Sequence, residues 1–76
     1  MKNLNQKKSQ TLLGSRIRKF RTEQNISQAQ LAYEVEISRE QITHTENGHV
    51  NTTFYTLYKI ASALNIEFDE LFTFLK

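Results

Sequence analysis

Apolar residues recur along the chain at the three- and four-residue steps of helices, and polar turn residues interrupt them at short intervals. Leu13, Ile17 and Phe20 follow this spacing and predict a helix over residues 10–24, ended by Asn25, which tolerates a left-handed backbone. No alternating apolar run predicts a strand, and the chain has two glycines and no proline. The expected fold is therefore all-α.

Two short helices are predicted next, each with a capping signal at its start. Ser27 with Gln30 and Ser38 with Gln41 have the spacing of a capping box, in which a serine hydroxyl accepts from a backbone amide and the glutamine reaches back. The first helix covers about eight residues, a tight turn follows, and the second helix ends before Gly48.

A polar loop at residues 49–52 precedes two more predicted helices. One begins near Phe54 and is stopped by Asn65, and a short last helix has Asp69 and Glu70 in its first turn, where the helix dipole favours negative charge. The chain is thus expected to form five helices.

Several segments keep a fixed order and spacing along the chain. They are residues 17–21 (IRKFR), 26–32 (ISQAQLA), 37–39 (ISR), 46–48 (ENG) and 57–66 (LYKIASALNI), together with Ile42. In these segments the chain resembles the lambda-repressor and Cro-like (XRE-type) family of bacterial transcriptional regulators over residues 12–72. The resemblance implies a compact five-helix domain whose second and third helices form a helix-turn-helix, with the third, residues 38–47, entering the major groove of double-stranded DNA.

By this resemblance, the base-reading positions fall on the outward face of the third helix. They are Ser38, Arg39, Glu40, Thr43 and His44. Arg39 can donate two hydrogen bonds to guanine, Glu40 can accept from the cytosine amine, and Thr43 can contact a thymine methyl. The alternative is that Arg39 and Glu40 are solvated first-turn residues, with Glu40 favouring the helix dipole.

The same resemblance implies phosphate contacts from Ser27, Gln28, Asn47 and Thr52, at the start of the second helix and in the turn after the third. Many members of the family carry lysine or arginine in that turn, but residues 49–53 carry neither. We therefore expect modest affinity, helped by residues 1–9 as a flexible basic arm lying on the duplex, with the domain itself over residues 10–76.

Arg21 and Glu46 occupy positions that pair in some relatives, and a partly buried ion pair is expected there. Two positions depart from the family pattern. Glu36 stands where the turn usually has glycine, so a strained left-handed residue is expected, and Thr45 replaces an apolar residue, so its hydroxyl is expected to bond to the carbonyl four residues earlier.

Charge is unevenly distributed along the 76 residues, although the net charge is only +2. Residues 1–21 contain seven lysines and arginines and no acid, whereas residues 22–76 contain three against eight acids. A basic end can attract a polyanion, but a lysine-bearing tail is also an ordinary solubilising feature.

Several functional classes are not expected from the residues present. There is no cysteine, no nucleophile with a base and no cofactor loop, so no enzyme, metal site, cofactor or small-molecule ligand is predicted. His44 and His49, five residues apart, should not share a helical face, and Tyr33, Tyr55 and Tyr58 are expected to be half-buried. No apolar run approaches the roughly 20 residues of a membrane span, which favours a cytoplasmic, nucleoid-associated bacterial protein.

The last predicted helix carries more apolar surface than a small core needs. We expect a homodimer through Phe68, Phe72, Phe74 and Leu75, with two recognition helices about 34 Å apart on a palindromic operator. The alternative is a monomer whose last helix packs inward.

The regulatory role expected is that of a repressor or autoregulator. A controller protein of a restriction-modification operon is an alternative, as is an antitoxin or other protein-binding module of the same fold. The polar outward face predicted for the third helix favours DNA as the partner.

Overall fold

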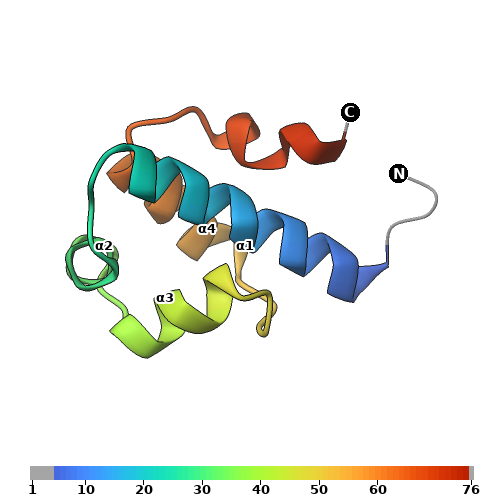
Figure 1. Cartoon of the computed structure of the whole chain (residues 1–76), viewed down its shortest axis with the longest axis horizontal. Helices are drawn as coiled ribbons and strands as arrows, with labels where there is room; N and C mark the ends of the chain where they lie inside the picture. Colours follow the sequence, from blue (N-terminus) through green and yellow to red (C-terminus); the bar gives the residue numbers. More distant parts are fainter. Residues whose placement is uncertain (1–4, 76) are drawn as a thin grey trace.

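The structure is a computed structural model that describes residues 5–75, and every element within that range is helical. The elements are α1 (Gln6–Glu23), α2 (Gln28–Val35), α3 (Arg39–Glu46), α4 (Phe54–Ala63) and the 3₁₀ segment η1 (Phe68–Leu75), which is kinked at Phe72. Figure 1 shows α1 across the centre, with η1 along one side of it and α3 on the other. The predicted all-α, five-helix fold is confirmed.

Local capping chemistry sets the starts of the two central helices. Ser38 Oγ accepts from the Gln41 amide at 3.1 Å while the Gln41 side chain accepts from the Ser38 amide at 3.4 Å, so this capping box is complete. Ser27 Oγ accepts from the Gln30 amide at 3.0 Å, which is the serine half of the predicted box.

Three non-glycine residues that follow helices adopt the left-handed backbone. Asn25 and Asn65 do so with φ of 58° and 57°, which confirms them as helix stops, and Glu36 does so with φ of 65° in the turn between α2 and α3. A residue with a Cβ is strained in this region by roughly 1–2 kcal/mol. The turn of the helix-turn-helix therefore carries the strain that its sequence predicted.

The start of α1 differs from the prediction. The helix begins at Gln6 instead of residue 10, because Asn5 Oδ1 caps it by accepting from the Lys8 amide at 2.8 Å. Glutamine and lysine are good helix formers even without an apolar stripe. The flexible arm predicted over residues 1–9 is therefore wrong for 6–9, and residues 1–4 lie outside the described part of the chain.

The core is built from aliphatic residues of all five elements. Those with no exposed surface include Ile17, Leu31, Ile42, Ile60 and Leu71. Because Leu71 is fully buried, η1 packs inward, and Phe68 and Phe72 lie partly buried against the core.

The tyrosines predicted to be half-buried are exposed instead. Tyr33 on α2 is 84% exposed, and Tyr55 and Tyr58 on α4 are also exposed, as is Phe54 at 69%. Smaller aliphatic side chains on the inner faces of α2 and α4 already fill the interior, so these rings remain outside.

Gly14 lets α1 and α3 approach backbone to backbone. The residue is buried, and a Cβ at this position would collide with the carbonyl oxygens of Thr45 and Glu46 at the end of α3. Since backbone atoms of two packed helices cannot move aside cheaply, this contact sets how closely the two helices cross.

We predict that Gly14→Ala lowers the free energy of unfolding by at least about 2 kcal/mol, because the added methyl group overpacks this crossing. Urea unfolding followed by circular dichroism measures the change. Ser15→Ala, at the exposed neighbouring position of the same helix, serves as the control and should leave stability nearly unchanged. Equal stabilities of the two variants would contradict the proposed backbone contact.

Candidate nucleic-acid interface

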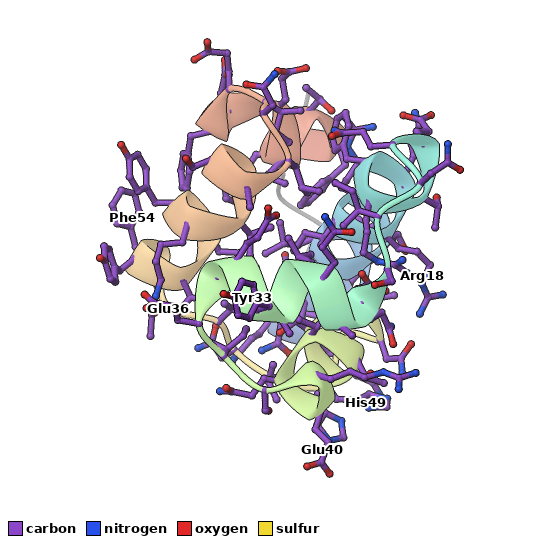
Figure 2. The ribbon with its side chains drawn as sticks, turned by 90° about the vertical axis from the view of Figure 1, so that its left-hand side faces the viewer. Arg18, Tyr33, Glu36, Glu40, His49 and Phe54 are labelled. Carbon is purple, nitrogen blue, oxygen red and sulfur yellow. The ribbon has the colours of Figure 1, made fainter. Side chains whose placement is uncertain are left out.

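The outward face of α3 carries the residues predicted to read bases. Arg39, Glu40 and His44 are exposed, as is the N-cap Ser38, and Thr43 is half-buried. Figure 2 shows Glu40 projecting from the molecule at this helix, on the same side as His49. The opposite face of α3 buries Ile42, Thr45 and Glu46. A short helix is thus displayed with a polar face outward and its inner face held by the fold.

Thr43 differs from the other outward residues because its hydroxyl has partners within the protein. Its Oγ1 lies 3.1 Å from both the Gln28 side-chain oxygen and the Arg39 carbonyl oxygen, each able to accept its proton. Thr43 therefore links the recognition face to α2.

Glu46, the last residue of α3, forms a bidentate ion pair with Arg21 of α1. Arg21 Nε donates to Oε2 at 2.6 Å and Nη2 donates to Oε1 at 3.1 Å. The Glu46 side chain has no exposed surface and the Arg21 side chain is 12% exposed. The ion pair expected from the resemblance is present, and it is more deeply buried than a surface pair.

Two further side chains complete the partners of the Glu46 carboxylate. Gln28 Nε2 donates to Oε1 at 3.0 Å, and Arg18 Nε lies 3.4 Å from the same oxygen. Burial alone would raise the pKa of Glu46, but hydrogen bonds from Arg21 and Gln28, the charge of Arg21 and the bond from Arg18 outweigh it and lower that pKa. We name this group of Arg18, Arg21, Gln28 and Glu46 the Glu46 cluster.

The Glu46 cluster also reaches the turns on either side of the helix-turn-helix. Arg21 Nη1 donates to the Ile26 carbonyl oxygen at 2.8 Å, and Arg18 Nη2 donates to Asn47 Oδ1 at 2.6 Å. The end of α1, the start of α2 and the end of α3 are therefore joined through one carboxylate.

The side chains of the four residues predicted to contact phosphate already have partners within the protein. Ser27 caps α2, the Gln28 side chain is engaged with Glu46 and Thr43, and Asn47 uses its oxygen to accept from Arg18. Thr52 is half-buried, with its hydroxyl 3.4 Å from that of Thr45. In this arrangement the Gln28 side chain holds α3, and the first backbone amides of α2 have no partner within the helix.

The Thr45–Thr52 contact also corrects a prediction. The hydroxyl of the buried Thr45 was expected to bond to the carbonyl four residues earlier, and it lies instead against Thr52 from the following loop. The loop folds back over the end of α3 and supplies a partner that the local sequence does not reveal.

His44 and His49 do not share a helical face, since His49 lies beyond the end of α3, but the loop brings their rings near each other. The ring centroids of His44 and His49 are 6.0 Å apart, because the His49 amide donates to the His44 carbonyl oxygen at 2.8 Å. Within residues 5–75, no group of three or more His, Cys, Asp or Glu side chains is placed to hold a metal ion. Among the described helices, none has the length and apolar character needed to cross a membrane.

Sequence reasoning missed the parts that Arg18, Gln28 and Gly14 play around α3. Arg18 stands three residues before Arg21 and so shares its helical face, which was a usable signal. An isolated glycine inside a helical pattern also points to a packing reason. The bond between Gln28 and Glu46 had no signal in the local sequence.

Comparison with known proteins bears directly on this arrangement. The family model for the helix-turn-helix matches residues 17–71, which contain the whole of α2, α3 and α4. The chain belongs to the helix-turn-helix family. It is a DNA-binding regulator, as the resemblance implied.

Relatives of this helix-turn-helix protein occur in Archaeoglobus fulgidus. Two HTH-type transcriptional regulators of that organism are 38% and 37% identical to it over 60 residues, which is 79% of this chain and 86% and 84% of the relatives. The similarity thus covers most of each protein.

Solved structures share the fold over a similar length. The restriction-modification controller protein C.AhdI from Aeromonas hydrophila is 34% identical, with a TM-score of 0.79 over 80% of this chain and 92% of that one. The clp gene regulator ClgR from Corynebacterium glutamicum has a TM-score of 0.82 at 21% identity, over 83% of this chain and 67% of its own, and shows the fold alone.

The lowered pKa of Glu46 makes stability depend on pH. The unfolded chain binds a proton at this group near the ordinary pKa of 4.5, whereas the folded protein keeps the carboxylate to lower pH. The stabilisation is therefore present above about pH 5 and is lost as the pH falls through the folded pKa.

We predict that Glu46→Gln is less stable than the parent by about 3 kcal/mol at pH 7, because it breaks a buried pair. Urea unfolding of both proteins from pH 7 to pH 3 should show this difference shrinking below pH 4.5. The other carboxylates are present in both proteins, so their contributions cancel in the difference between the two free energies of unfolding. A difference that stays constant with pH would rule out the buried carboxylate as its source.

Proposed function

We propose that this protein binds a specific double-stranded DNA sequence by placing α3 in the major groove, and that it acts there as a repressor or autoregulator of transcription. The observation that carries the proposal is the outward face of α3, where Arg39, Glu40 and His44 are exposed on a helix whose inner end is held by the Glu46 cluster. A preorganised polar helix can enter the groove without paying for its own ordering on binding.

The outward residues have distinct roles in this proposal. Arg39 at the first turn of α3 donates to the acceptor pair of a guanine, Glu40 accepts from a cytosine amine, and Thr43 contacts a thymine methyl. Ser38 and His44 complete the base-reading set, while Ser27, Asn47, Thr52 and the backbone amide of Gln28 lie against phosphates. Binding, and not catalysis, is the activity proposed, and a protein with this role works on the bacterial nucleoid.

A two-fold homodimer on a palindromic operator is also part of the proposal. Its support is a row of aromatic rings that runs from α4 along η1: Phe54 to Phe68 at 5.0 Å, Phe68 to Phe72 at 5.1 Å and Phe72 to Phe74 at 6.4 Å between centroids. Phe54, at the exposed end of this row, extends the interface expected on η1. The side chain of Leu75, also expected in that interface, lies outside the described part of the structure.

An open pocket stands at the other end of this aromatic row. It has a volume of about 340 Å³, and Phe72 and Phe74 line it together with Leu13, Val50 and Leu57. A mainly apolar hollow lined by half-buried aromatic rings is a surface that a second copy of the chain can cover.

Control of a restriction-modification operon is the second candidate function. It is favoured by the 34% identity to a controller protein of which this chain covers 92%. A selected binding site located before its own gene, next to genes for a methyltransferase and an endonuclease, would distinguish this role from that of a general repressor.

We predict that Arg39→Ala weakens binding to the preferred duplex by roughly 1–3 kcal/mol and leaves binding to random duplex almost unchanged. The preferred duplex is first obtained by selection from a random oligonucleotide pool, and both affinities are then measured by fluorescence anisotropy. Equal losses on the two duplexes would remove Arg39 from base reading. Failure of the parent to bind any duplex in a salt-dependent way would overturn the proposed function itself.

For the dimer, we predict that Phe54→Asp and Phe74→Asp each halve the mass observed by sedimentation equilibrium, since a buried charge opposes an apolar contact. Tyr33→Asp is the matched control for Phe54→Asp, because both residues are exposed aromatics and Tyr33 lies on α2, outside the proposed interface (Figure 2). A parent that sediments as a monomer, or Phe54→Asp and Phe74→Asp variants that keep the parent's mass, would contradict the dimer.

A further inference from the structure

Positive charge beside α3 comes from α1, because the loop at residues 49–53 contains no lysine or arginine. The Glu46 cluster contains two arginines and one carboxylate, which leaves one positive charge uncompensated. Arg21 is almost buried and bonded to both carboxylate oxygens, whereas the Arg18 side chain is 50% exposed. The excess charge is therefore presented to solvent by Arg18.

The position of Arg18 is defined by two contacts. Its Nε lies 3.4 Å from Glu46 Oε1 and its Nη2 donates to Asn47 Oδ1 at 2.6 Å, so the guanidinium lies at the C-terminal end of α3. Gln28, the first residue of α2, bonds to the same Glu46 oxygen. Figure 2 shows Arg18 at the edge of the molecule on the side of α3 that carries His49, away from Phe54.

Most of the hydrogen-bonding capacity of this guanidinium is still unused. Arginine has five N–H donors, and among the described residues Arg18 donates only through Nε and Nη2. The planar group can therefore present further donors to an oxyanion while Glu46 and Asn47 hold it in place. A cation already oriented in this way loses less entropy on binding than a free lysine does.

The geometry points to Arg18 as a DNA phosphate clamp: a guanidinium fixed by Glu46 and Asn47 that binds one backbone phosphodiester beside the recognition helix. The inference rests on the proposed function, since the phosphate belongs to the duplex in which α3 is placed. Arg18 thereby replaces the positive charge that the following loop lacks. It also couples the Glu46 cluster, which orients α3, to the register of the protein on the DNA backbone.

The test compares Arg18→Gln, Arg18→Lys and the parent on the selected duplex over a range of salt concentrations. A phosphate contact releases counterions, so the loss of one contact lowers the slope of log Kd against log salt by about 0.9 and weakens binding roughly eightfold at 0.1 M salt. Arg18→Gln should show both effects for each bound protomer. Arg18→Lys keeps the charge and should restore the slope. Lys59→Gln removes one charge from α4, where the amine lies 5.0 Å from the Tyr55 ring, and should leave the slope unchanged.

A purely structural role for Arg18 predicts a different result. If the residue only steadied α3, Arg18→Gln would reduce the preference for the selected duplex over random duplex and leave the salt slope at the parent value. That outcome, or an equal fall in slope for Lys59→Gln, would overturn the clamp while the proposed function stands. Absence of salt-dependent binding by the parent would instead remove the proposed function.

The contacted phosphate can also be located. A single neutral methylphosphonate linkage is moved along each strand of the selected duplex, and binding of the parent and of Arg18→Gln is compared at every position. The clamp predicts one linkage per half-site at which the parent loses affinity roughly eightfold and Arg18→Gln loses none. If no linkage separates the two proteins, Arg18 does not bind a phosphate.

Discussion

The orientation of α3 depends on a carboxylate that has no exposed surface. Glu46 accepts hydrogen bonds from Arg21 and Arg18 of α1 and from Gln28 of α2, so any rotation of α3 would leave a charge buried without its partners. Leaving a buried charge unpaired is costly, although the intact pair adds little net stability because desolvation offsets the attraction. The cluster therefore contributes more to the geometry of the outward face than to the free energy of folding.

Backbone contacts restrict the same helix where α1 crosses it. Gly14 allows the carbonyl oxygens of Thr45 and Glu46 to lie against α1, and Gly48, with φ of 74°, turns the chain immediately beyond α3 against Thr11. Ile42 and the other aliphatic core residues hold α3 against the core, but hydrophobic burial is non-directional and does not fix the rotation of the helix. The glycines set the distance and the polar cluster sets the rotation, and together they determine which side chains face outward.

Local chemistry explains what could be predicted from the sequence. The serine caps of α2 and α3 and the stops at Asn25 and Asn65 depend on residues within a few positions, and the pairing of Arg21 with Glu46 followed from the family resemblance. What could not be predicted depends on distant partners. Thr52 finds Thr45, and Gln28 finds Glu46, only after the chain has folded. Helical periodicity likewise assigns Tyr33 a direction on α2 but does not show whether another element covers the ring. Within residues 5–75 no element covers it.

Arg39, Glu40 and His44 are exposed, and none of their side chains makes a hydrogen bond within the part of the chain described. Substitutions at these positions are therefore expected to change stability by no more than about 0.5 kcal/mol. Such a surface is free to vary during evolution while the scaffold beneath it stays the same. Duplicated copies of such a gene could diverge toward new target sequences one residue at a time, without passing through unfolded intermediates.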